Sequence, residues 1–309
     1  MIIITGPTAL GKTRLAARLA ARLGGEIISA DSRQVFKNMD IGTGKDLQDY
    51  KVDDITVPYH LVDIRFPGDT FSVYDFVAEY NRVRPEILNR GRHVILCGGT
   101  GLYIEAVVAG YYLPFVPVDQ QLRERLQPLS DDKLTRMLAS MRSLHNTTDI
   151  TDRDRLVRAL EIEIWKKEHP EQVPPVPPYF ILGIHAERQE LRRRITERLF
   201  YRLKNGLIEE VQSLLERGVP PGKMEFYGLE YRYVYRYLCG QLTFEEMSGQ
   251  LNTAIHQFAK RQQTWFRRME KRGFRIHWLD VASGADEIFA QALRLLEDHR
   301  HEWDELKKE

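Results

Sequence analysis

The sequence predicts an α/β fold, with a parallel β-sheet covered by helices on both faces and interrupted by a helical insert. Short apolar runs alternate with helical patterns through the first hundred residues, as in chains that build parallel sheets. From about Leu113 to Glu168 the sequence is charged and helical in period, without a strand pattern. Pro174-Pro175-Val176-Pro177-Pro178 then predicts a rigid, extended connector. We therefore expect a core domain of residues 1–113 and 178–309 and an insertion domain of residues 114–177.

The first strand and the first helix flank the most informative motif of the chain. The β-branched run Ile2-Ile3-Ile4 precedes Gly6-Pro7-Thr8-Ala9-Leu10-Gly11-Lys12-Thr13, and residues 14–23 have the composition of a strong helix. A glycine-rich loop between a strand and a helix, closed by Lys-Thr, is a phosphate-binding P-loop. Its backbone N–H groups and the helix dipole favour an anion, Lys12 would neutralise phosphate oxygens, and the Thr13 hydroxyl would bind Mg²⁺. The predicted core is therefore P-loop NTPase-like and binds a phosphorylated ligand.

The other elements are predicted from the period and length of the apolar runs. We expect strands at 26–29, 93–97 and 179–184, and helices at 71–88, 188–217, 244–272 and 286–306. Polar clusters follow two of the strands, Asp31-Ser32-Arg33-Gln34 and Gly98-Gly99-Thr100-Gly101. Because ligands bind beyond the carboxyl ends of parallel strands, these clusters and the P-loop should converge on one crevice.

Composition and charge narrow the class of protein. No apolar run reaches the 18 residues of a membrane-spanning helix, and no signal-peptide pattern is present. The two cysteines, Cys97 and Cys239, form no metal-ligand pair and are typical of a reducing cytoplasm. The formal net charge is only +1, but residues 188–204 hold seven basic and two acidic side chains, and residues 260–275 hold seven and one. Two basic clusters, one interleaved with aromatic residues, favour a polyanionic partner.

Two polar residues are candidates for chemistry. Asp31 follows the second predicted strand and faces the P-loop, where it would act as a general base or hold a Mg²⁺-bound water. An Asp-Ser pair is also a good helix N-cap, and the spacing leaves both interpretations open. Thr100 would donate its hydroxyl to a substrate or simply complete a turn.

These motifs together resemble those of the tRNA dimethylallyltransferases, also called tRNA isopentenyltransferases, over most of the chain. A P-loop alone occurs in many proteins, whereas the full series is specific. The matching segments are the P-loop, Ser29-Ala30-Asp31-Ser32-Arg33-Gln34-Val35-Phe36, Met39-Asp40-Ile41-Gly42-Thr43-Gly44-Lys45, His60-Leu61-Val62-Asp63, Gly98-Gly99-Thr100-Gly101-Leu102-Tyr103, Arg155-Leu156-Val157-Arg158-Ala159-Leu160-Glu161 and Ala259-Lys260-Arg261-Gln262-Gln263-Thr264-Trp265-Phe266-Arg267.

The resemblance implies transfer of a dimethylallyl group from its diphosphate to N6 of adenosine 37 in tRNA, giving N6-isopentenyladenosine and diphosphate. The P-loop would then hold a diphosphate leaving group, with Mg²⁺ on Thr13. Asp31 would accept the proton of the attacking amine, Arg198 would reach the diphosphate, and Thr100 and Arg123 would contact substrate near the reacting centre. The resemblance also assigns tRNA contacts to the range 225–230 and to Asp31, Ser32, Arg33, Gln34, Thr100, Arg123, Asp154, Arg155, Leu156, Val157, Arg158, Lys260, Arg261, Gln262, Thr264, Trp265 and Arg267. A monomeric cytoplasmic enzyme is expected.

Four departures from the family pattern concern substrate recognition. Residues 145–152 lack the usual Asp-Pro and Pro-Asn-Asp pattern. Leu10 stands where the family loop usually has Ser, which removes a hydroxyl beside the phosphates. Glu230 and His256 stand where the family usually has Lys and Arg, so two positive charges are lost. The alternatives left open are a P-loop kinase or NTPase that binds ATP, a prenyltransferase acting on free adenine nucleotides, and a tRNA-binding paralogue without activity.

Overall fold

The computed structural model describes residues 1–111, 113, 116–141, 152–169 and 175–306. The chain forms two compact units, one of Met1–Ala109 with Val176–Glu309 and one of Gly110–Pro175. From the sequence we predicted an insertion domain of residues 114–177. Residues 114 and 115, where that insert was expected to begin, and Pro174 of the connector lie outside the described residues.

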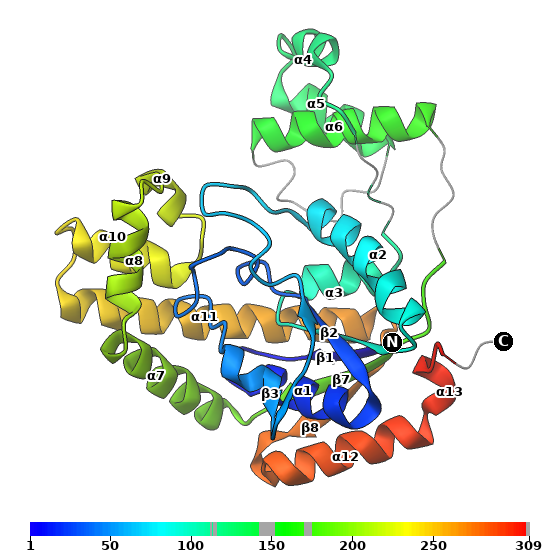
Figure 1. Cartoon of the computed structure of the whole chain (residues 1–309). Helices are drawn as coiled ribbons and strands as arrows, with labels where there is room; N and C mark the ends of the chain where they lie inside the picture. The colour runs from blue at the N-terminus through cyan, green and yellow to red at the C-terminus, as the bar shows by residue number, and fades with distance from the viewer. Residues whose placement is uncertain (112, 114–115, 142–151, 170–174, 307–309) are drawn as a thin grey trace. The chain divides into compact units, whose positions relative to one another are not determined.

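The first unit is built on a six-stranded parallel sheet with the order β5-β2-β6-β1-β7-β8 (Figure 1). The strands are β1 (Ile2–Thr5), β2 (Gly25–Ser29), β5 (Tyr59–His60), β6 (His93–Cys97), β7 (Phe180–His185) and β8 (Ile276–Asp280). A separate antiparallel hairpin joins β3 (Lys51–Val52) and β4 (Ile55–Thr56) after the 3₁₀ turn η1 (Leu47–Tyr50). The parallel sheet confirms the predicted fold class.

Helices bury both faces of this sheet, which is why its central strands read as continuous apolar runs. Ile2 and Ile4 pack in one core with α1 (Lys12–Leu23) and α12 (Ala285–Asp298). Ile3 packs in the other core with α2 (Val73–Asn89) and α3 (Gly101–Val108). The alternation of Ile2, Ile3 and Ile4 between two cores follows from the two-residue period of a strand.

The C-terminal part differs from the prediction in three places. The single helix expected at 188–217 is broken into α7 (Arg188–Lys204) and α8 (Leu207–Glu216), because Gly206 has a φ of +101°. Strand β8 was missed, and so were α9 (Pro221–Met224) and α10 (Leu229–Leu238). The helix expected at 286–306 ends at Asp298 and is followed by the short helix α13 (Arg300–Trp303). A 3₁₀ turn, η3 (Val281–Ser283), precedes α12.

The long helix α11 (Phe244–Lys271) matches the predicted helix of residues 244–272. It begins with a capping box, in which the Thr243 hydroxyl accepts the Glu246 N–H and the Glu246 carboxylate accepts the Thr243 N–H. The N-terminal part of α11 packs in the core on one face of the sheet, and its C-terminal part packs in the core on the other face. The helix therefore passes from one face of the sheet to the other.

The second unit contains α4 (Gln120–Leu126), α5 (Asp131–Met141) and α6 (Arg153–Glu168). These helices enclose a small core of Leu122, Leu126, Leu134, Leu138, Leu156, Ala159 and Leu160. In neither unit does a described helix combine the length and the apolar character that a membrane crossing requires.

Candidate active site

The P-loop connects β1 to α1 and has the backbone curvature that an anion site needs. Gly6 has a φ of +138°, and a Cβ atom there would lie 2.3 Å from the carbonyl oxygen of Ile184 in β7, so glycine is required. Ala9 and Gly11 also have positive φ, at 65° and 77°. None of the described side chains caps α1 at Gly11. The first N–H groups of the helix are therefore available to a phosphate.

A cavity of about 180 Å³ opens beside this loop. Within its wall Lys12 donates from Nζ to the carbonyl oxygen of Pro7 at 2.7 Å. Burial lowers the pKa of Lys12 to about 8; the charge of Arg198 acts in the same direction, while Cys97 and Asp31 oppose it. The cavity is lined by Ala9, Gly11, Lys12, Thr13, Asp31, Gln34, Thr43, Gly44, Asp46, Asp49, Tyr50, Cys97, Gly98, Gly99 and Arg198.

Two arginines of α7 contact the same acid of this cavity: Arg198 lines the phosphate cavity itself, and Arg202 lines the wider cavity described below. Both donate to the Asp46 carboxylate, at 2.9 and 3.4 Å, and Arg198 also donates to the Thr8 hydroxyl at 3.5 Å. They meet at Gly44, where a Cβ atom would lie 2.4 Å from either guanidinium. Burial lowers the pKa of Arg202 to about 10. Arg198 was predicted from the sequence, whereas Arg202 and Asp46 were missed because no P-loop pattern marks them.

Asp31 caps a turn rather than a helix. Its Oδ1 accepts the backbone N–H groups of Arg33 and Gln34, at 2.8 and 3.4 Å, and the residues that follow form turns. The other oxygen, Oδ2, forms no hydrogen bond with any of the described residues. One oxygen therefore fixes the carboxylate in place and the other is available to a substrate.

A second and wider cavity, of about 460 Å³, adjoins the first. The two share Lys12, Asp31, Thr43 and Gly99 in their walls, so the phosphate site and the wider cavity form one crevice. Thr100 lines the wider cavity, and its hydroxyl oxygen accepts the Ser32 N–H at 3.2 Å. The predicted convergence of the three polar clusters is thus present in the structure.

Gln262 of α11 ties two of these clusters together. Its Oε1 accepts the Thr8 N–H at 3.0 Å, and its Nε2 donates to the carbonyl oxygen of Gly99 at 2.8 Å. A Cβ atom at Gly99 would lie 2.5 Å from this amide. Gln262, predicted as a tRNA contact, thus holds the P-loop against the loop that follows β6.

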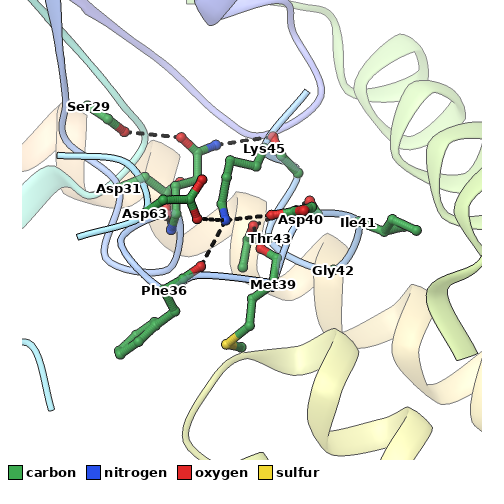
Figure 2. Close-up of polar contacts among 12 residues, drawn as sticks. Ser29, Asp31, Phe36, Met39, Asp40, Ile41, Gly42, Thr43, Lys45 and Asp63 are labelled. Carbon is green, nitrogen blue, oxygen red and sulfur yellow. Dashed lines mark hydrogen bonds and ion pairs between the residues drawn. The ribbon is translucent and has the colours of Figure 1, made fainter. Parts of the chain in front are cut away.

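The segment Met39–Lys45 contributes Gly42, Thr43 and Gly44 to the walls of the crevice. It is held in place by its own buried lysine, Lys45 (Figure 2). Lys45 donates from Nζ to the carbonyl oxygen of Phe36 at 2.8 Å and is paired with the carboxylates of Asp40 and Asp63, at 2.6 and 2.5 Å. A buried ammonium needs such partners to offset its desolvation. Lys45 therefore fixes three separate backbone segments relative to one another.

Gln34 adds a second link to this segment. Its Oε1 accepts the Ser29 hydroxyl and its Nε2 donates to the carbonyl oxygen of Gly44, both at 3.1 Å (Figure 2). The side chain therefore connects the end of β2 to the segment that carries Thr43 and Gly44.

Glu210 of α8 provides a further anchor for the segment Met39–Lys45. Its carboxylate accepts the backbone N–H groups of Asp40, Ile41 and Gly42, at 2.8, 2.7 and 3.0 Å. The Tyr231 hydroxyl donates to it at 2.7 Å. Glu210 was not predictable from a local pattern, because the contact joins α8 to a loop 170 residues earlier in the chain.

The residues of α11 that were predicted to meet RNA lie on different sides of the helix. Arg261 and Gln262 line the wider cavity, whereas Lys260 and Arg267 line another groove. Trp265 packs against Gly101, where a Cβ atom would lie 2.4 Å from its ring, and Arg268 stacks 4.0 Å from that ring. The exposed Thr264 hydroxyl donates to the carbonyl oxygen of Lys260.

The other predicted contacts belong to the second unit. Glu161, almost fully buried, accepts two hydrogen bonds from Arg123, at 2.7 and 2.9 Å, and one from Arg158 at 2.9 Å. Burial raises the pKa of Glu161, but these hydrogen bonds outweigh it and leave the pKa below its ordinary value. Asp154 and Arg155 are exposed, while Leu156 is fully buried in the core of this unit, so its side chain supports α6.

The structure also locates three of the four departures from the family pattern; residues 145–151, which belong to the fourth, lie outside the described residues. Leu10 is buried in the core and does not line the phosphate cavity. Its side chain therefore packs in the core, where the usual family residue would carry a hydroxyl. Glu230 lines the wider cavity, where burial raises its pKa. His256 contacts the Thr196 hydroxyl and the carbonyl oxygen of Arg192, both at 3.3 Å, and burial lowers its pKa.

The fold and the crevice define a P-loop protein in which a phosphate-binding loop adjoins a carboxylate and a hydroxyl at the carboxyl ends of parallel strands. Comparison with known proteins gives the family. The model of the IPP transferase family matches residues 34–269, and that of isopentenyl transferases matches residues 1–59. The chain therefore belongs to the IPP transferase family, which confirms the resemblance seen in its motifs.

Individual relatives agree with this assignment. The chain is 52% identical to tRNA dimethylallyltransferase 1 of Porphyromonas gingivalis, over 96% of this chain and 98% of the relative. It is 49% identical to tRNA dimethylallyltransferase 1 of Parabacteroides distasonis, over 96% and 97%. The crystal structure of the tRNA isopentenylpyrophosphate transferase of Bacillus halodurans is similar with a TM-score of 0.71, at 31% identity over 99% of this chain and 98% of that one. The fold is also that of a eukaryotic dimethylallyltransferase acting on tRNA (TM-score 0.77, 20% identity, 100% and 81% covered).

Proposed function

We propose that this chain transfers a dimethylallyl group from dimethylallyl diphosphate to N6 of adenosine 37 in tRNA, releasing diphosphate. The observation that carries this proposal is the position of Asp31, which lines both the phosphate cavity and the wider cavity. The names of its relatives support the transferred group and the class of acceptor. A monomeric state and a cytoplasmic location stay predictions from the sequence.

The phosphate cavity has the groups that a diphosphate needs. The open N–H groups of α1, the Lys12 ammonium and the Arg198 guanidinium would hold its oxygens. These cations stabilise negative charge most strongly after the C–O bond breaks, when the charge on diphosphate is greatest. Binding of this kind favours the transition state over the ground state.

The oxygen atoms in this cavity also fit Mg²⁺. Thr13, Asp46 and Asp49 line it, and Mg²⁺ is commonly bound by one or two side chains together with phosphate oxygens and water. Among the described residues there is no group of three or more histidines, cysteines and acids placed to hold a metal, so most ligands would come from the diphosphate and water. Bound Mg²⁺ would neutralise charge on the leaving diphosphate.

The wider cavity would receive the acceptor base. An adenine must leave its stack to reach Asp31, at a cost of a few kcal/mol in a loop. N6 attacks C1 of the dimethylallyl group, the N6–C1 bond forms as the C1–O bond breaks, and Oδ2 of Asp31 accepts the proton that N6 loses. The Thr100 hydroxyl lies beside Asp31 in the cavity wall and would orient the amine.

The test is a transfer assay with dimethylallyl diphosphate, Mg²⁺ and unmodified tRNA, followed by nucleoside analysis by mass. An A37→G transcript and free AMP serve as alternative acceptors. We expect product on A37 alone. Product on AMP would identify an enzyme acting on free nucleotides. Absence of product together with ATP turnover would indicate a P-loop kinase or NTPase, and absence of both a tRNA-binding paralogue.

A further inference from the structure

A second charged groove lies between α7 and α11. It has a volume of about 540 Å³, and we call it the α7–α11 groove. Arg188 and Arg192 line it from α7, and Lys260 and Arg267 line it from α11. Among the described residues in its wall none is acidic, and His256 carries the one aromatic ring; the rest are Ala186, Leu191, Ile195, Thr253, Gln257, Ala259 and Gln263.

These four cations differ from their neighbours in that the described residues supply no partner for their side chains. On the same helix Arg193 is paired with Glu190 and Glu197, at 2.8 and 2.7 Å, and Arg198 and Arg202 are paired with Asp46. By contrast, the side chains of Arg188, Arg192, Lys260 and Arg267 form no ion pair or hydrogen bond within the described part of the chain. Like charges held together without counter-charges repel one another, and a bound anion would relieve this repulsion.

His256 adds no charge to the groove at neutral pH. Burial lowers its pKa, and the charge of Arg192 lowers it further, although a backbone hydrogen bond opposes both. The positive potential of the groove therefore comes from the three arginines and the lysine.

The groove and the crevice lie on either side of α11. Arg261 and Gln262 line the crevice, and the adjacent Lys260 and Gln263 line the groove. Between them runs the solvent-exposed ridge of the helix, which carries Lys260, Arg261 and Thr264. A helix is about 10–12 Å across, so a strand of a few nucleotides can cross this ridge. A base in the crevice and phosphates in the groove can therefore belong to one RNA.

We propose that the α7–α11 groove binds the phosphate backbone of the RNA substrate, a few nucleotides away from the modified base. The inference rests on the proposed function for the identity of that substrate. From Thr253 to Arg267 the groove extends along α11 for about 20 Å, which suits a run of phosphates better than a mononucleotide. The described residues of its wall include no Phe, Tyr or Trp, and this also favours backbone contacts over base stacking.

The test compares the double variant Arg188→Ala/Arg192→Ala with the matched control Arg193→Ala, whose side chain is already ion-paired. Affinity for unmodified tRNA is measured as a function of salt concentration. Two lost phosphate contacts should reduce the slope of log K against log salt by about 1.4–1.8 and raise the KM for tRNA with little change in kcat. The control and the charge-conserving Arg188→Lys/Arg192→Lys variant should keep the wild-type slope.

An unchanged salt slope and KM in the Ala double variant, with its thermal unfolding unaltered, would overturn the inference. A variant that loses binding of inorganic triphosphate but keeps its tRNA affinity would also overturn it, because the ligand would then be a small polyphosphate. Failure of the proposed function would be distinguishable from failure of this inference. In that case the wild-type protein would give no prenylated tRNA in the transfer assay, whatever the salt slope of the variants.

Discussion

At the scale of single residues, Lys12 shows how the fold prepares a phosphate site. Burial lowers its pKa from 10.5 to about 8, so the folded chain gives up its proton at lower pH than the unfolded chain does. Between these two values the unfolded chain binds more protons, and this residue makes the free protein more stable as the pH rises through that range. A bound diphosphate acts in the opposite direction, because it favours the charged ammonium.

Affinity for diphosphate should therefore depend on pH with a defined sign. We expect it to be greatest below about pH 8 and to fall as the pH rises above the pKa of Lys12. Calorimetric titration of diphosphate in the presence of Mg²⁺, across a pH series, measures this. The Lys12→Met variant should bind weakly and lose this pH dependence. Wild-type affinity that stays constant or rises above pH 8 would contradict the assignment.

At the scale of elements, the structure adds features that periodicity does not reveal. The strands at 26–29, 93–97 and 179–184 were predictable because burial on both faces makes their sequences continuously apolar. Strand β8 was not predictable, because His277 interrupts its short apolar run, Asp280 ends it, and its burial is incomplete. The break between α7 and α8 lies inside a helical sequence pattern, and it consists of Asn205, which leaves the helical conformation, and Gly206, which has a positive φ.

The candidate site was predictable only in part, for the same physical reason. The P-loop, Asp31 and Thr100 follow strands, so topology alone brings them together. Gln262 and Glu210 act through contacts that span 254 and about 170 residues. No local pattern encodes such pairs.

The contact between α8 and the segment Met39–Lys45 should contribute to the free energy of unfolding. Glu210→Ala would leave three backbone N–H groups without their acceptor, and we expect it to lower the free energy of unfolding by about 2 kcal/mol. Tyr231→Phe removes only one hydrogen bond and should cost about 1 kcal/mol. Urea unfolding measures both. Equal stability of Glu210→Ala and wild type would mean that the loop does not depend on α8.

In the second unit Glu161 has the corresponding role. Glu161→Ala would remove the shared partner of Arg123 and Arg158 and is expected to destabilise this unit by about 2 kcal/mol, since both arginines are partly exposed. Hydrogen exchange should then become faster in α4 and α6 and remain unchanged in the β-sheet of the first unit. Unaltered exchange in α4 and α6 would show that the cluster is not structurally important.

At the scale of the whole molecule, the crevice is assembled from segments distributed through the first unit. The P-loop, residues 31–34, the segment Met39–Lys45, residues 98–101, α7 and α11 all contribute to its walls. Lys45, Gln262 and Glu210 connect these segments, so the phosphate site and Asp31 keep a fixed relation to one another. Such preorganisation allows a bound diphosphate ester and an incoming base to meet in reactive geometry.

The most direct test of this account is the single-turnover rate of dimethylallyl transfer by Asp31→Asn at saturating tRNA, together with its affinity for tRNA. Asparagine retains the Oδ1 acceptor used by Arg33 and Gln34 but is a far weaker base. The account predicts a rate about 10² to 10⁴ times lower than that of wild type, with tRNA affinity nearly unchanged. A rate close to that of wild type would show that Asp31 does not accept the proton, and would contradict the central claim.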